Sequence, residues 1–299
     1  MRKILTLTIF ALFFGQAFGQ TPEADFIKEN YTKIEKMIPM RDGVKLFTSI
    51  YIPKSQKAKY PFLISRTPYT VQPYGEDKFK TSLGNYIEMA KEGFIFVYQD
   101  VRGRWMSEGT FADVRPHNPA KKTVQDVDES SDTYDTVDWL IKNVPNNNGR
   151  AGLFGISYPG FYSTAALPGA HPGLRAVSPQ APVTDWFIGD DFHHNGAFFL
   201  MDAFAFQFTF GAPRPKPITP DKGPKSFVFP IKDNYRFYLD LGALKNVNKR
   251  YYGDSIKFWN EMMAHSNYDA YWKARNIRPH LTDIKPAVMV VGGFFDAED

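Results

Sequence analysis

The fold is decided by residues 152–160, Gly152-Leu153-Phe154-Gly155-Ile156-Ser157-Tyr158-Pro159-Gly160. An apolar run typical of a buried strand enters Gly-x-Ser, and small residues compatible with a helix follow at 163–166. In a nucleophile elbow, a serine occupies such a strand-to-helix turn and its hydroxyl stands clear of the strand ends. The pattern therefore predicts Ser157 as a nucleophile, with free backbone N–H groups at the helix start to stabilise an oxyanion. A serine in an ordinary glycine-rich turn is the alternative, because Pro159 stands where Gly-x-Ser-x-Gly has its second glycine.

Strand-like and helix-like segments alternate on both sides of this turn. Residues 47–52 alternate after an Arg41-Asp42-Gly43 turn, which indicates a hairpin. Strands are predicted from apolar runs at 60–65, 94–98, 151–154 and 176–179, and helices at 81–92, ending at Gly93, and after a cap at Ser130 or Ser131. This rhythm indicates an α/β fold with a mostly parallel sheet covered on both faces.

The alternation stops near Trp186. A stretch rich in Phe and Tyr and interrupted by prolines follows, and residues 286–292 then form an apolar run typical of a buried strand. We expect residues 20–185 to form the first part of the core, residues 186–284 to form a helical or irregular cap over an active site, and residues 285–299 to return to the core.

The first residues are typical of an export signal. Arg2 and Lys3 precede an apolar run at 4–14, and Ala17-Phe18-Gly19 offers a cleavage site, so residues 1–19 are predicted to be a signal peptide. A retained membrane anchor is the alternative, although the run is short for a bilayer. We expect a secreted or periplasmic protein that is not attached to a membrane after cleavage.

Charge and cysteine content narrow the classes of function. The net charge of +4 includes two positive charges from the predicted signal peptide, so the mature chain gives no reason to expect a nucleic-acid partner. The chain has no cysteine, which excludes a disulfide framework, a thiol nucleophile and a thiolate metal site. The core must therefore be stabilised by packing.

Short motifs occur in a fixed order along the chain. They are Arg41-Asp42-Gly43, Arg66-Thr67-Pro68-Tyr69, Asp100-Val101-Arg102-Gly103 followed by Ser107-Glu108-Gly109, residues 132–140, and Gly155-Ile156-Ser157-Tyr158-Pro159-Gly160. This order resembles that of the cocaine esterase / Xaa-Pro dipeptidyl-peptidase-like family of serine hydrolases, over essentially the whole mature chain. The resemblance implies an α/β-hydrolase fold with a cap insertion, and a C-terminal jelly-roll domain that this chain does not contain.

The resemblance also implies catalytic roles. The Tyr69 hydroxyl and the Tyr158 backbone N–H would form the oxyanion hole, and Asp296 would be the triad acid that orients an imidazole. By itself, a tyrosine that follows a proline is as well explained by packing. Asp100 and Arg102 are expected to form a structural ion pair.

The histidine of the triad is not evident. All six histidines precede Asp296, whereas the family's histidine lies in a loop beyond the acid. We therefore expect the general base to lie beyond residue 299, the chain to be a fragment, and this fragment alone to be inactive.

The end of the chain, Asp296-Ala297-Glu298-Asp299, resembles the signature of the α-amino acid ester hydrolases. In that subfamily the Glu and the last Asp join a third aspartate in a carboxylate cluster, and Asp191 matches that position. Asp191, Glu298 and Asp299 are thus predicted to bind substrate. Carboxylates beside the acyl pocket would attract a substrate ammonium, by about 4 kcal/mol for a close pair at an effective dielectric constant near 20. A solvated acidic loop or a Ca²⁺-binding cluster is the alternative.

The resulting hypothesis is acyl transfer from a small-molecule ester or amide, without a cofactor or a metal. α-Amino acid esters, or β-lactam amides with a free α-amino group, are the preferred substrates. Glutaryl-cephalosporin acylase, general carboxylesterase and Xaa-Pro dipeptidyl-peptidase activities are alternatives. A catalytically silent fragment that acts only as a binding module is an alternative from another class, and a homo-oligomer is compatible with the sequence.

Overall fold

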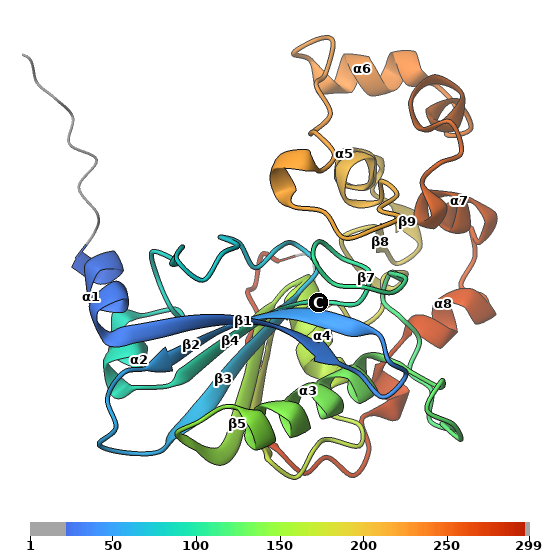
Figure 1. Cartoon of the computed structure of the whole chain (residues 1–299). Helices are drawn as coiled ribbons and strands as arrows, with labels where there is room; N and C mark the ends of the chain where they lie inside the picture. Colours follow the sequence, from blue (N-terminus) through green and yellow to red (C-terminus); the bar gives the residue numbers. More distant parts are fainter. Residues whose placement is uncertain (1–21, 297–299) are drawn as a thin grey trace, which may run out of the picture.

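A mixed sheet forms the body of the protein (Figure 1), which is described for residues 22–296 by a computed structural model. Within these residues the sheet has seven strands. In spatial order they are β1 (Tyr31–Pro39), β2 (Lys45–Pro53), β4 (Ile95–Asp100), β3 (Tyr60–Thr67), β5 (Asn147–Ile156), β6 (Leu174–Gln180) and β10 (Ala287–Val288). β1 and β2 form an antiparallel hairpin and β2 is antiparallel to β4, whereas every later pair is parallel. The predicted mostly parallel sheet is confirmed.

Helices cover both faces of the sheet. They are α1 (Pro22–Asn30) and α2 (Ile87–Glu92) on one face, and α3 (Glu129–Asn143) and α4 (Tyr158–Ala165) on the other. Successive strand residues point to opposite faces, as β4 illustrates. Phe96 packs with Ile27 of α1 and Ala90 of α2, whereas Val97 belongs to the cluster that contains Val137 of α3.

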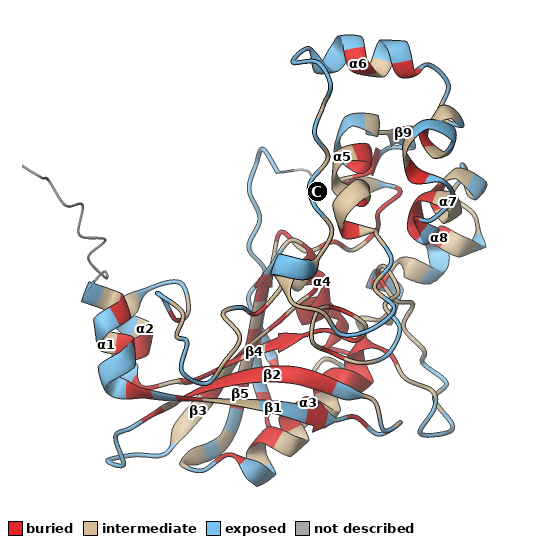
Figure 2. Ribbon diagram, turned by 45° about the horizontal axis from the view of Figure 1, so that its top comes forward, coloured by how far each residue is buried: buried red, intermediate tan, exposed pale blue. Residues whose placement is uncertain are grey.

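The segment between β6 and β10 forms a separate cap above the sheet (Figure 1). It contains a small three-stranded sheet, four α-helices and short helical turns: β7 (Gly189–Asp190), β8 (His193–His194), β9 (Ala197–Phe198), α5 (Leu200–Phe210), η1 (Pro220–Lys222), α6 (Asn234–Leu241), η2 (Asn248–Tyr252), α7 (Lys257–Ala264), α8 (Ala270–Arg275) and η3 (Arg278–His280). Figure 2 shows that buried residues concentrate in the central strands and α4, and that α6 at the outer end of the cap is largely exposed.

Aromatic side chains hold the cap together and attach it to the core. Phe204 of α5 stacks on Tyr252, with ring centroids 5.4 Å apart. The same buried cluster includes Tyr158 and Tyr162 of α4. The cap is therefore anchored on the helix that follows Ser157.

Two predicted helix boundaries are wrong. The helix predicted at 81–92 begins only at Ile87, because Gly84 turns the chain with a φ of +70° and its N–H donates to the Tyr98 hydroxyl. The N-cap of α3 is Asp128 rather than a serine. Its carboxylate accepts from the Ser131 N–H at 3.0 Å and the Ser131 hydroxyl accepts from the Asp128 N–H at 2.9 Å, so both free N–H groups are satisfied.

The apolar run at 286–292 is not the buried strand that its sequence predicts. Only Ala287 and Val288 form a strand, paired with β6, and both are exposed. Val290, further along, is 67% exposed. The reason is that β10 is the edge of the sheet, so no strand lies on its other side within residues 22–296.

The predicted ion pair between Asp100 and Arg102 is also wrong. Arg102 instead pairs with Asp42 and Asp132, each at 2.6 Å, and so ties the β1–β2 turn to α3. Asp100 accepts hydrogen bonds from the Val71 N–H and the Tyr74 hydroxyl. Burial raises the pKa of Asp100 to about 7.

A fully buried arginine joins the sheet to α3. Arg66 of β3 donates from Nε to Gln99 Oε1 at 2.8 Å and from Nη1 to Thr133 Oγ1 at 2.8 Å. Its Nη1 also lies 3.3 Å from Glu129 Oε2, and both side chains are buried. Burial raises the pKa of Glu129, and the nearby Arg66 charge opposes that rise.

We expect Arg66→Met to lower the free energy of unfolding by about 3–5 kcal/mol, because it leaves the buried Glu129 with only the more distant Arg115, at 3.5 Å, as a cation. Urea denaturation would measure the loss. The double variant Arg66→Met/Glu129→Gln should recover part of it, and Arg150→Met, at an exposed position, is the matched control. A loss no larger than that of the control would show that the buried pair does not stabilise the sheet–helix contact.

Candidate active site

Ser157 occupies a strained bend between β5 and α4. Its φ of 61° and ψ of −122° lie in a region that residues other than glycine rarely adopt. The Ser157 N–H donates to Gln180 O at 2.9 Å, and the Phe161 N–H donates back to Ser157 O at 3.1 Å. Such a conformation costs on the order of 1–3 kcal/mol and persists because the surrounding structure enforces it.

The glycines around Ser157 allow the strand and the helix to approach closely. A Cβ on Gly155 would lie 2.2 Å from Pro159 O, and one on Gly160 would lie 2.6 Å from Gln180 O. The second glycine is therefore needed where α4 meets β6, three residues after the serine. Pro159 is tolerated because it lies in the first turn of α4, where its missing N–H costs nothing.

A cavity of about 550 Å³ opens beside this bend. Three predicted site residues line it: Ser157 and Tyr69 from the core, and Asp191 from the cap. The remaining lining residues belong to the cap: Phe192, Phe199, Met201, Asp202, Ala205 and Phe206. The cavity thus combines a serine hydroxyl, a phenol, two carboxylates and an apolar wall.

Tyr69 is held against the cavity by other aromatic rings. It follows the end of β3 and Pro68, and its ring makes edge contacts with Tyr158 at 6.3 Å and Phe210 at 5.8 Å between centroids. Tyr69 is 40% exposed and lines the cavity.

Tyr158 contributes through its backbone. Its N–H is the first of α4 and has no acceptor within the helix. Its ring is buried, and its hydroxyl accepts from the Val114 N–H at 2.9 Å. Burial raises the pKa of the Tyr158 hydroxyl well above its usual value, so this group serves as a fixed neutral anchor.

Two other aspartates act on Asp191 of the cavity. Burial, and then the charges of Asp296 and Asp202, raise the pKa of Asp191. Asp296 itself is exposed and its N–H donates to Gly293 O at 3.2 Å; it is not among the residues that line the cavity. Glu298 and Asp299 lie outside the described residues.

Sequence reasoning missed Asp202 and the apolar wall of α5. Asp202, Ala205 and Phe206 are spaced to share one face of a helix, and all three line the cavity. This spacing is visible in the sequence, but the dense aromatic composition around it obscured the helix.

Within residues 22–296, no histidine lines the Ser157 cavity. His193 is buried with its Nδ1 3.1 Å from Trp186 O, and His117, His171 and His265 each lie beside an aspartate. The described residues also contain no group of three His, Asp or Glu side chains placed to hold a metal, and every helix among them is too short or too polar to cross a bilayer.

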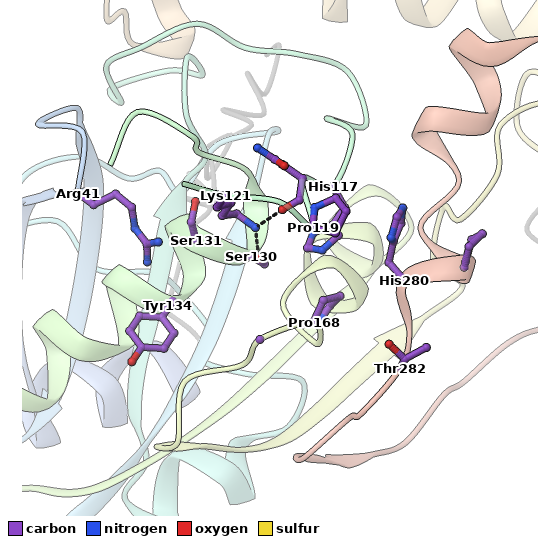
Figure 3. Close-up of a pocket in the computed structure, with 13 residues that line it drawn as sticks. Arg41, His117, Pro119, Lys121, Ser130, Ser131, Tyr134, Pro168, His280 and Thr282 are labelled. Carbon is purple, nitrogen blue, oxygen red and sulfur yellow. Dashed lines mark hydrogen bonds between the residues drawn. The ribbon is translucent and has the colours of Figure 1, made fainter. Parts of the chain in front are cut away.

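A larger cavity of about 680 Å³ lies away from Ser157, between the start of α3 and the end of the cap (Figure 3). Arg41, His117, Lys121 and His280 line it. Most of these basic groups are already paired, Arg41 with Asp135 at 2.8 Å, and Lys121 and His117 with Asp128 at 2.6 Å and 2.9 Å. The cavity contains no candidate nucleophile arranged as Ser157 is.

Comparison with known proteins identifies the family. A model of the X-Pro dipeptidyl-peptidase (S15 family) matches residues 42–299. This chain belongs to the S15 family. Cocaine esterase from Rhodococcus sp. (strain MB1 Bresler) is 32% identical over 166 residues, which are 54% of this chain and 25% of that protein.

Two solved structures resemble this S15 chain closely. An aminopeptidase from the marine sediment archaeon Thaumarchaeota archaeon is 34% identical with a TM-score of 0.77, over 93% of this chain and 45% of that one. A selenomethionine-labelled α-amino acid ester hydrolase is 32% identical with a TM-score of 0.77, over 90% of this chain and 44% of that one. The α/β-hydrolase fold predicted from the motifs is therefore confirmed, and the chain spans less than half the length of these relatives.

We expect Gly160→Ala to lower the free energy of unfolding by about 1–3 kcal/mol, because the added methyl group would be forced against Gln180 O and Pro182. Thermal or urea unfolding would measure this. Gly292→Ala is the control, since a Cβ there meets nothing within 4 Å. If both variants are equally stable, the close approach of α4 and β6 does not constrain the bend.

Proposed function

We propose that this protein is a serine hydrolase that cleaves ester or amide bonds through an acyl-enzyme on Ser157. The observation that carries the proposal is the strained bend, which places the Ser157 hydroxyl in one cavity with Tyr69 and at the start of α4. Membership of the S15 family supports the same class of chemistry.

The proposed reaction has two steps. The Ser157 oxygen attacks the carbonyl carbon while a base takes the hydroxyl proton, and the Tyr69 hydroxyl and the Tyr158 N–H stabilise the negative oxygen. The alcohol or amine then leaves with that proton, and water attacks the acyl-enzyme to release the acid and restore the serine. We assign the base to a histidine outside residues 22–296, oriented by Asp296, because no described histidine lines the cavity.

We further propose that the acyl group carries a free α-amino group. The carboxylates of Asp191 and Asp202 line the cavity beside Ser157, and Glu298 and Asp299 would add to this negative charge. Burial, and then the charges of Asp296 and Asp202, raise the pKa of Asp191, and a bound ammonium would favour its ionised form. Two relatives, an aminopeptidase and an α-amino acid ester hydrolase, are named for amino-acid substrates, which supports this preference.

Phe192, Phe199 and Phe206 suit an aromatic or aliphatic acyl side chain. α-Amino acid esters, and β-lactam amides with a free α-amino group, therefore remain the proposed substrates. The predicted signal peptide at 1–19 lies outside the described residues, and secretion or periplasmic location stays part of the proposal.

We expect Ser157→Ala in the full-length protein to reduce ester hydrolysis on the order of 10⁵–10⁶-fold and to abolish labelling by a fluorophosphonate probe, because the nucleophile is lost. Tyr69→Phe should lower kcat about 10²–10³-fold, the usual cost of one oxyanion donor. Ser55→Ala, on an exposed loop, is the control. Labelling that persists in Ser157→Ala would place the nucleophile elsewhere, and a full-length protein that never labels would support the silent binding module.

We expect Asp191→Asn in the full-length protein to raise KM for phenylglycine methyl ester about 10- to 100-fold, because an ammonium loses a charged partner. KM for phenylacetate methyl ester, which has the same ring but no amine, should change less than about twofold, within the range of a lost neutral contact. Steady-state kinetics on the two esters separate the effects. Equal changes for both substrates would remove the carboxylates from amine recognition.

A further inference from the structure

A cavity of about 350 Å³ lies between the cap and the core loop that follows β4. Its charged lining residues are Arg104 and Asp113 from the core, and Arg214, Lys257, Glu261 and Arg275 from the cap. Cationic groups outnumber carboxylates on its walls. In the cavity of Figure 3 most of the basic groups are paired with aspartates, whereas Arg104 and Arg214 form no ion pair within residues 22–296.

Two guanidinium groups converge here on one carbonyl oxygen. Arg104, only 3% exposed, donates from Nη1 to Phe210 O at 2.8 Å, and Arg214 donates from Nη1 to the same oxygen at 3.0 Å. Neither forms an ion pair within residues 22–296. Burial, and then the Arg104 charge, lower the pKa of Arg214 to about 10. Like charges held together in a poorly hydrated place are unfavourable unless an anion compensates them.

Several donors in this cavity lack acceptors. The buried Nε atoms of Arg214 and Arg275 have no hydrogen-bond partner, and Arg104 Nη2 donates to no group within the described residues. Buried donors of charged groups are normally satisfied. Three such donors in one cavity indicate a hydrogen-bond acceptor that residues 22–296 do not provide.

The two carboxylates on the walls do not supply that acceptor. Glu261 accepts from the Tyr271 hydroxyl at 2.8 Å and lies 3.6 Å from Lys257 and 3.8 Å from Arg275, so it compensates these two cations and neither Arg104 nor Arg214. Asp113 accepts from the Tyr158 hydroxyl at 3.4 Å and makes no hydrogen bond to Arg104 or Arg214; burial raises its pKa to about 7, and the Arg104 charge opposes that rise.

The start of α7 adds to the positive potential. Lys257 and Phe258, its first residues, line the cavity, and the first N–H groups of a helix have no acceptor within it. A helix N-terminus favours an anion through these N–H groups and its dipole.

We propose that this cavity binds a small oxyanion, a phosphate or carboxylate group, that bridges Arg104 of the core and Arg214 of the cap. The planar guanidinium forks suit the oxygens of either group. This site is separate from the serine chemistry, because it uses none of the residues that line the Ser157 cavity.

The bound anion would also steady the wall of the Ser157 cavity. Arg104 lies under the Phe210 ring, with its guanidinium carbon 4.0 Å from the centroid, and its Nε donates to Pro68 O. Phe210 and Pro68 are the immediate supports of Tyr69. In this proposal the anion holds the cap and the core in position and takes no part in the reaction.

The test is a titration of the full-length protein with inorganic phosphate and, separately, with sodium acetate, at an ionic strength kept constant with chloride. Isothermal calorimetry and the midpoint of thermal unfolding are the measurements. We expect saturable binding of at least one of the two, and a rise in the unfolding midpoint that chloride does not produce. The stronger response identifies the group as phosphate or carboxylate.

Arg214→Gln should weaken that binding about tenfold or more, because one charged donor is lost. Lys257→Gln, whose side chain is 81% exposed and so cannot disturb folding, should weaken it by a smaller factor. Lys249→Gln, an exposed lysine outside the cavity, is the charge-matched control, and Ser157→Ala should bind as the wild type does. Absence of saturable binding by both anions, or binding unchanged in Arg214→Gln and Lys257→Gln, overturns the proposal without affecting the hydrolase assignment.

Discussion

The close approach of β5, α4 and β6 is the constraint on which the site depends. Gly155 and Gly160 have no Cβ atoms, which would otherwise hold these elements apart. Between the two glycines the chain turns through the positive φ of Ser157. The hydrogen bond from the Ser157 N–H to Gln180 O fixes this bend to β6. The serine hydroxyl is thus directed by backbone contacts, and its own side chain makes no hydrogen bond to residues 22–296.

The helix that follows the bend connects the core to the cap. Tyr158 presents its N–H at the start of α4, while its ring stacks on Tyr162 at 5.5 Å and meets Trp186 of the cap edge-on at 5.2 Å. Tyr158 therefore packs against the cap with its ring and presents the N–H that we propose as an oxyanion donor. A change in the aromatic cluster of the cap would alter the position of the N–H that we propose faces the oxyanion.

The sequence was sufficient for the fold and for part of the site. Alternation located β2, apolar runs located β3 to β6, and the Gly-x-Ser turn located the bend, because all of these depend on local geometry. The sequence was not sufficient where contacts between distant segments determine the local structure. Leu83 and Gly84 leave the helical conformation because they pack under the sheet, and the apolar run at 286–292 is exposed because its strand lies at the edge. Asp202 and the cluster around Arg104 required three-dimensional contacts, since their members come from separate segments.

The anchoring of the cap through Tyr158 has a consequence for substrate entry. If the cap moved away from the core, stacked aromatic rings would separate and the buried aromatic cluster would be exposed to water. Large hinge movements of the cap are therefore energetically disfavoured. Access to the serine must then depend on the rotation of flexible rim side chains such as Met201, which is 52% exposed. Side-chain rotation can widen such an entrance only slightly, because the backbone around it stays in place. We therefore expect activity to fall sharply above a certain substrate size instead of declining gradually.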